Sequence, residues 1–162
     1  MGAWKVFVAP STFHIPEEID LTNANWNLKV EDWQPANDYG TTGKAGAETV
    51  KELIELNLES LKSWPDIPQI ANVSGVGTYS TSINLPAEWD SDTHGAILEL
   101  GQVVDAFQLT INNNVVGVDQ VGAIADISNF LHAGLNEIVI RVSTTLNNRL
   151  AVLHEGVALR DI

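Results

Sequence analysis

Two groups of carboxylates lie next to tryptophans in this chain, and they are its first candidates for chemistry. Glu31 and Asp32 precede Trp33, and the segment PAEWDSDTHG at positions 86–95 places acidic residues around Trp89. Hydrolysis of a glycosidic bond needs an acid and a base or nucleophile about 5–9.5 Å apart. Either group of carboxylates could supply such a pair only if the fold held two of them at this separation. Acidic turn residues in a chain with 21 acidic and 8 basic residues are usually solvated or cap a turn, so we expect no catalytic residues.

Other catalytic and metal-binding motifs are missing from the sequence. There is no G-x-S-x-G motif, and the four histidines are far apart without H-x-x-x-H spacing. Calcium is the better metal candidate because it takes oxygen ligands, which the loop containing Asp90 and Asp92 could offer, as could Glu31 and Asp32. Asp90 and Asp92 are therefore the candidate ligands of a structural calcium, and no other cofactor is expected.

Tryptophan rings could bind sugar, because an aromatic face packs against the apolar C–H face of a pyranose while polar side chains fix the hydroxyls. Trp33 and Trp89 lie at strand or loop ends beside carboxylates, where we expect half-exposed rings. Trp26 shares the apolar face of its strand and is expected in the core, and Trp64 is expected to pack under its own loop. Trp33 and Trp89 are the candidate platforms.

The polar sequence Asn147-Asn148-Arg149 has two interpretations. It could form a buried network in which Arg149 ties strand ends together through backbone carbonyls. It could instead contact sugar or a neighbouring catalytic domain. Asn148 and Arg149 are for this reason added to the candidate sugar-binding residues.

Composition limits the class of protein. The formal net charge of −13 and the lack of Lys/Arg clusters exclude nucleic acid as a partner. No apolar run approaches the roughly 20 residues that a membrane helix needs. The chain has 162 residues and no cysteine, so we expect one soluble domain over residues 1–162 without disulfides.

The hydrophobic pattern predicts an all-β protein. Residues with alternating or strand-forming character occupy 4–9, 26–33, 53–59, 76–85, 106–111, 115–116 and 135–142. The stretch 47–61 also has helical character, but the alternation of its apolar and polar residues favours a strand. Residues 10–25 are expected to be a connector, 34–46 a polar loop, 112–114 a hairpin turn, and 151–162 a possible last strand. A short helix capped by Asp126 or Ser128 should end before Gly134. We predict an antiparallel β-sandwich of jelly-roll type with about eight strands and one or two short helices.

Several segments in order give the chain a family resemblance. The matching pieces are SGVGTYSTSINLP (74–86), GAILELGQVVDAFQLTINN (95–113), Val116-Gly117, ADISNFLHAGLNEIVIRV (125–142) and LNNRL (146–150). With them the chain resembles the sugar-binding, galactose-binding-like domain of family 2 and α-L-rhamnosidase-like glycoside hydrolases. The resemblance implies a jelly roll, which in this superfamily often holds a structural calcium. It also implies that catalytic carboxylates lie on a separate barrel domain.

These observations predict a non-catalytic domain that binds carbohydrate or braces the catalytic domain of a glycoside hydrolase. Its partners would be an oligo- or polysaccharide and that catalytic domain. The alternative is an interaction or structural module that no longer binds sugar, because no aromatic residue stands between Val118 and Ala123. The start of the sequence shows no signal peptide, and an extracellular location is expected from the resemblance alone.

Overall fold

The computed structural model describes residues 4–10, 17–34, 49–103, 105–145 and 148–149. Within these residues it has ten strands and two single 3₁₀ turns. The elements are β1 (Lys5–Pro10), β2 (Glu17–Asp20), β3 (Trp26–Gln34), β4 (Val50–Leu58), η1 (Trp64–Asp66), β5 (Gly75–Leu85), β6 (His94–Glu99), β7 (Ala106–Ile111), β8 (Asn114–Val116), β9 (Ile124–Asp126), η2 (Ser128–Phe130) and β10 (Gly134–Ser143). The predicted all-β fold is confirmed.

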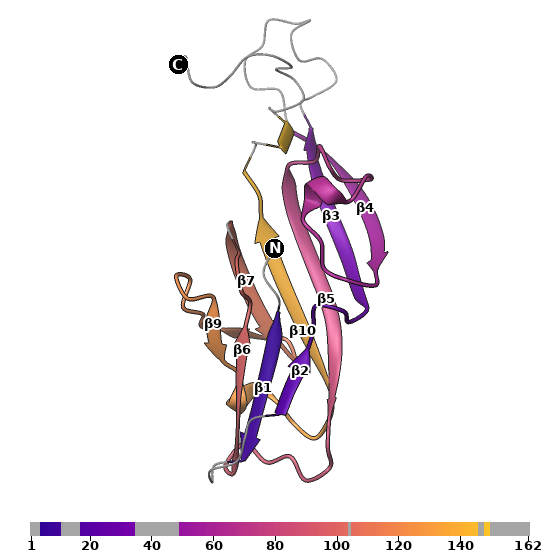
Figure 1. Cartoon of the computed structure of the whole chain (residues 1–162). Helices are drawn as coiled ribbons and strands as arrows, with labels where there is room; N and C mark the ends of the chain where they lie inside the picture. The colour runs from indigo at the N-terminus through magenta and orange to yellow at the C-terminus, as the bar shows by residue number, and fades with distance from the viewer. Residues whose placement is uncertain (1–3, 11–16, 35–48, 104, 146–147, 150–162) are drawn as a thin grey trace, which may run out of the picture.

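The strands form two antiparallel sheets of unequal size. The small sheet has the order β2-β1-β6-β9, and the large sheet has the order β4-β3-β5-β10-β7-β8. Figure 1 shows the long strands β3, β5 and β10 of the large sheet reaching well beyond the small sheet. The predicted antiparallel β-sandwich is therefore confirmed, with one sheet only partly covered by the other.

The alternation read from the sequence sets the two faces of the large sheet. In β3, Trp26, Leu28 and Val30 are buried while Lys29 between them is exposed. The ambiguous stretch around Ile54 is β4, an edge strand that pairs with β3. The strand prediction is correct there, since a period of two lets β4 turn one face inward whereas a helix could not join the sheet.

Two expectations need correction, and two others fall wholly or mostly on residues that the structure does not describe. The predicted connector 10–25 contains β2, a short strand that pairs with β1 alone among the described strands and whose one apolar residue is Ile19. The predicted short helix is the single turn η2; Asp126 Oδ1 accepts the Ser128 N–H at 3.0 Å, and β10 follows too soon for further turns. The predicted loop 34–46 begins at Gln34, which is the last residue of β3, and the rest of this loop lies outside the described residues, as does the possible last strand 151–162.

The centre of the core is an aromatic cluster that joins both sheets. Trp4, Trp26 and Tyr79 are all buried and meet edge to face, with ring centroids 5.1 Å apart for the two tryptophans and 5.5 Å apart for Trp4 and Tyr79. Such edge-to-face pairs add to the stabilisation from burial. The Trp26 indole N–H also donates to the Leu21 carbonyl at 2.8 Å. The prediction that Trp26 is a core residue is confirmed.

The predicted asparagine hairpin is also confirmed. Asn112 and Asn113 take positive φ angles of 48° and 66°, which asparagine tolerates better than most residues. The Asn112 amide donates at 2.8 Å to the side chain of Asn136, which is fully buried. Asn136 in turn donates to the carbonyls of His132 and Gly134 at 2.7 and 2.9 Å. The turn is thus tied to the start of β10 by two asparagine side chains.

A loop covers the part of the large sheet that the small sheet leaves open. Residues 59–74, which we call the cap loop, carry η1 over the inner face of β3 and β5 (Figure 1). Trp64 of this loop is only 6% exposed and lies directly on Gly77 of β5. A Cβ atom on Gly77 would lie 2.6 Å from Trp64 Cζ2, so only glycine leaves room for the ring. The expectation that Trp64 packs under its loop is confirmed.

Candidate functional site

Trp33 presents a partly open ring near the end of β3. Its side chain lies on the outer face of the large sheet, and 39% of the residue surface is exposed. Lys51, its partner in register on β4, places Nζ 4.9 Å from the ring centroid in a cation–π contact. A sugar that stacks on Trp33 must therefore displace Lys51 or use the part of the ring that Lys51 leaves open.

Glu31 holds both of these residues in place. Its Oε2 accepts the Trp33 indole N–H at 3.2 Å and the Lys51 ammonium at 3.1 Å. The hydrogen bond from Trp33, followed by that from Lys51, lowers the pKa of Glu31 below its usual value. Glu31 is thus an ionised anchor that fixes the orientation of the Trp33 ring.

Asp32 faces the other way and forms a buried ion pair. It is 5% exposed, and its Oδ1 accepts a hydrogen bond from Nη2 of Arg149. Its Oδ2 accepts the Gln34 amide at 2.9 Å. Both carboxylate oxygens are therefore occupied, and the Arg149 side chain ties the end of β3 to the segment that follows β10.

Asn148 and Arg149 also bind the residues just before β5. The Asn148 amide donates to the Val73 carbonyl at 3.3 Å, and the Arg149 N–H donates to Ser74 Oγ at 3.2 Å. The Ser74 carbonyl accepts the N–H of Trp33 at 3.1 Å. The structure therefore brings together three of the four candidate sugar-binding residues at one end of the sandwich. The network interpretation describes the geometry, except that Arg149 pairs with a carboxylate and not with backbone carbonyls.

Trp89 lies elsewhere and does not have the expected exposure. It follows the end of β5, whereas Trp33 lies beside its start, and an eleven-residue strand spans about 33 Å. Trp89 is only 7% exposed, and its ring lies on His94 with centroids 5.3 Å apart. The expected half-exposed ring is wrong, because the charged neighbours in sequence turn outward while the indole packs into the core.

The candidate calcium ligands belong to the same turn as Trp89. Asp90 Oδ1 accepts the Asp92 N–H at 3.0 Å, and the Asp90 carbonyl accepts the N–H groups of Thr93 and His94 at 3.1 and 2.8 Å. In the part of the chain that the structure describes, no three His, Asp or Glu side chains gather as a metal site would require. Calcium at Asp90 and Asp92 stays a prediction.

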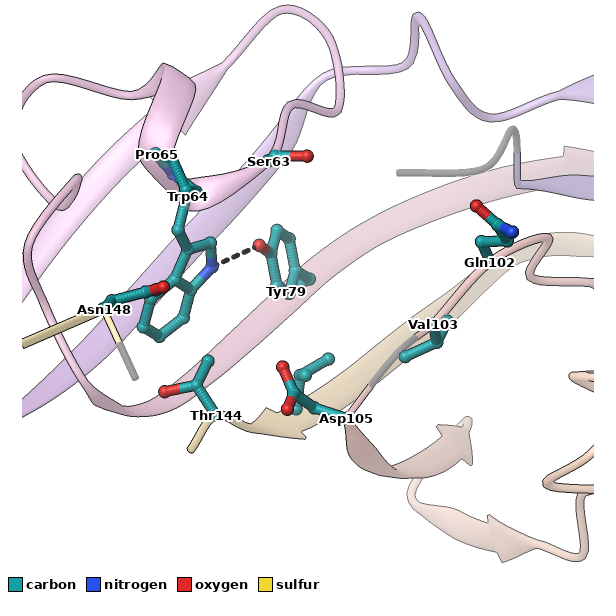
Figure 2. A pocket seen from close by; sticks show the side chains of 10 residues that line it. Ser63, Trp64, Pro65, Tyr79, Gln102, Val103, Asp105, Thr144 and Asn148 are labelled. Atoms are coloured by element: carbon teal, nitrogen blue, oxygen red, sulfur yellow. Dashed lines mark hydrogen bonds between the residues drawn. The ribbon is translucent and has the colours of Figure 1, made fainter. Parts of the chain in front are cut away.

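A pocket that sequence reasoning missed opens between the cap loop and the β6–β7 connection (Figure 2). Its volume is about 200 Å³. The lining includes Trp64 of the cap loop, Tyr79 and Val142 of the large sheet, Val103 and Asp105 of the β6–β7 connection, and Asn148. The predicted polar residue Asn148 therefore contributes to this pocket as well as to the network around Ser74.

The Tyr79 hydroxyl is the central polar group of the pocket. It accepts the Trp64 indole N–H at 2.7 Å, as the dashed line in Figure 2 marks. Burial raises the pKa of Tyr79 to about 12, so the hydroxyl keeps its proton at neutral pH. Among the described residues this proton has no acceptor, so it is available to a ligand in the pocket.

The family model described as glycosyl hydrolases family 2, sugar binding domain, matches residues 57–158. The chain belongs to this family. The described residues that line the pocket all fall inside the matched range, whereas Trp33 precedes it.

A solved structure gives independent support for the fold. The rhamnosidase from Novosphingobium sp. PP1Y aligns with 83% of this family 2 domain at a TM-score of 0.57 and 24% sequence identity. The domain spans 12% of the length of that enzyme chain. No curated protein matches the sequence. In the described residues, no helix is long and apolar enough to cross a membrane.

Proposed function

We propose that this family 2 sugar-binding domain holds a carbohydrate substrate for a glycoside hydrolase and does not itself break glycosidic bonds. The observation that carries the proposal is the family match over residues 57–158. The partly exposed ring of Trp33, oriented by Glu31 and bordered by Lys51, is the aromatic surface that such a role requires.

The geometry of the carboxylates supports a non-catalytic role. Glu31 and Asp32 are neighbours on a strand, so their side chains point to opposite faces of the sheet and cannot act on one glycosidic bond. In addition, the Asp32 carboxylate accepts hydrogen bonds from Arg149 and Gln34, and the Asp90 carboxylate accepts one from the N–H of Asp92. The catalytic carboxylates would then belong to another domain of the parent enzyme, with this domain beside it in the extracellular medium.

Tryptophan fluorescence tests the proposal directly. The purified chain is titrated with neutral and acidic plant cell-wall oligosaccharides, and a saturable change in emission is expected. Trp33→Ala should weaken binding of a glycan that stacks on this ring by about tenfold, a loss typical of an aromatic contact. The control is Leu135→Ala, which removes another large exposed side chain, 66% exposed and on β10, and should bind like the native chain.

The same titration can refute the proposal. A folded native chain that binds none of the glycans would eliminate sugar binding. That result would favour a bracing or interaction module, which can be assayed by association with a purified catalytic domain.

A further inference from the structure

We propose that the pocket between the cap loop and the β6–β7 connection is a subsite for one neutral sugar residue and rejects uronic acids. This inference rests on the proposed carbohydrate-binding function and adds a second contact to it, separate from the Trp33 surface. It names the site, the size of the unit that the site takes and the charge that it excludes.

The size of the pocket limits the ligand to a single ring. Its volume of about 200 Å³ lies below the roughly 300–1,000 Å³ of pockets that enclose drug-sized ligands. Trp64 of the cap loop lies on one side of Tyr79, and Val103 of the β6–β7 connection lies on the other (Figure 2). An oligosaccharide would have to leave all but one of its rings outside.

The polar groups of the pocket complement sugar hydroxyls. The Tyr79 hydroxyl has a proton to donate, because its oxygen already accepts from Trp64. The carboxylate of Asp105 makes no hydrogen bond or ion pair with any described residue, and it can accept from two adjacent hydroxyls. The side-chain amide of Gln102 is likewise unpaired among the described residues and can both donate and accept. Each hydroxyl of a sugar can donate one hydrogen bond and accept two, so it matches this mixture.

The apolar part of the lining suits the C–H face of a sugar ring. Val103, Val142 and the indole of Trp64 supply apolar surface in the same pocket as these polar groups. Buried apolar contact combined with a few convergent polar groups is the usual composition of a ligand pocket. The lining of the pocket therefore contains both kinds of group that a sugar site needs.

The charge of the lining excludes acidic sugars. Among the described residues, the lining has one ionisable carboxylate, Asp105, and no Lys, Arg or His. The carboxylate of a uronic acid would be brought next to a like charge and partly removed from water, without a cation to compensate. One carboxylate is also too few for a metal site, since calcium takes 6–8 oxygen ligands. A neutral sugar is the class of ligand that remains.

Nuclear magnetic resonance can locate the ligand and measure its affinity together. The native domain is titrated with glucose, galactose, mannose and rhamnose, each as the methyl glycoside, and with glucuronate and galacturonate as charged counterparts of the first two. We expect the Trp64 indole N–H signal and the methyl signals of Val103 and Val142 to move with one common dissociation constant for a neutral sugar. Uronates should bind more weakly than the matching neutral sugars.

Asp105→Asn provides the decisive variant, because it keeps the shape of the side chain and removes only its charge. The variant should bind the neutral sugar with about fivefold lower affinity, since hydrogen bonds to charged groups are about twice as strong as neutral ones. The difference in affinity between the neutral sugar and the matching uronate should become smaller, because the like charge is gone. Glu137→Gln, the same change of charge on the exposed face of β10, is the matched control and should leave both affinities unchanged.

Each other outcome overturns a defined part of the argument. Native affinity in Asp105→Asn, or galacturonate binding as tightly as galactose, would refute the subsite. The subsite would also be refuted if an oligosaccharide bound without moving the three pocket signals and Trp33→Ala abolished that binding. In that case the proposed function would stand. If no mono- or oligosaccharide moved any signal of the folded domain, the proposed function itself would fail.

Discussion

Gly77→Ala should destabilise the domain because the cap loop leaves no space for a methyl group at this position. The added Cβ would lie 2.6 Å from Trp64 Cζ2 and 3.4 Å from Leu28 Cδ1. The indole cannot easily move away, since Trp64 is buried and its N–H is bound to Tyr79. The ring must tilt, or the cap loop must lift from β5.

The expected loss is the overpacking cost less a small gain in the unfolded chain. Inserting a methylene into a packed core costs about 1–3 kcal/mol. Replacing glycine by alanine at an ordinary φ returns about 0.4–1 kcal/mol by restricting the unfolded chain. The free energy of unfolding should fall by about 1–2 kcal/mol, which lowers the Tm of a domain of this size by about 2–8 °C.

Urea and thermal unfolding measure this loss, and another glycine is the matched control. Gly117 has no atom within 4 Å of an added Cβ and no left-handed φ. Gly117→Ala should therefore change the free energy of unfolding by no more than about 0.5 kcal/mol. Equal stabilities of the two variants would refute the packing argument.

A double-mutant cycle tests whether Trp64 is the group that clashes. Trp64→Phe removes the outer ring that contains Cζ2, so Gly77→Ala should cost about 1 kcal/mol less in that background than in the native one. Additive effects of the two substitutions would mean that the strain arises elsewhere, for instance at Leu28.

Two further predictions concern hydrogen bonds and pH. Tyr79→Phe should lower the free energy of unfolding by about 1–3 kcal/mol, because it leaves the buried Trp64 N–H without an acceptor. In the native chain the pKa of Tyr79 is raised from 10.0 to about 12, so the free energy of unfolding should fall as the pH rises through this interval. Tyr79→Phe should remove this loss of stability. It should also remove the tyrosinate absorbance that Tyr79 contributes near pH 12. Hydrogen bonds from the Ser128 side chain and N–H lower the pKa of Asp126 from 3.8, so its contribution is present above that pH and lost as the pH falls through the folded value. Asp126→Asn should flatten this acid branch in urea unfolding followed against pH, and an unchanged acid branch would contradict the assignment.

Most strands could be predicted from the sequence, whereas β2, β6 and β9 could not. Trp26, Leu28 and Val30 alternate with polar residues because β3 has one face in the core. β2 and β9 are too short, at four and three residues, to show a period, and they form because a neighbouring strand offers hydrogen bonds. Pairing of this kind depends on residues far away in the sequence, which a local pattern does not contain.

The candidate site was predictable only where local sequence decides the outcome. Trp33 lies at the polar end of an alternating strand, so its outward orientation follows from the register of β3. Trp89 lies in a turn, where charged neighbours do not indicate which way an indole points, and it is buried. The pocket joins residues as distant as Trp64, Asp105 and Asn148, and the Trp-Pro pair and the asparagine-arginine cluster were its only signals in the sequence.

Because the two sheets differ in width, the sequence of this domain can diverge in one region without disturbing the core. The inner face of the large sheet is covered partly by the small sheet and partly by the cap loop (Figure 1). The pocket lies between the cap loop and the β6–β7 connection. Insertions or substitutions in the cap loop or the β6–β7 connection would change the shape of this pocket without shifting the register of any strand. The shape of the pocket can therefore change between related sequences while the aromatic core and the hydrogen bonds between strands stay as they are.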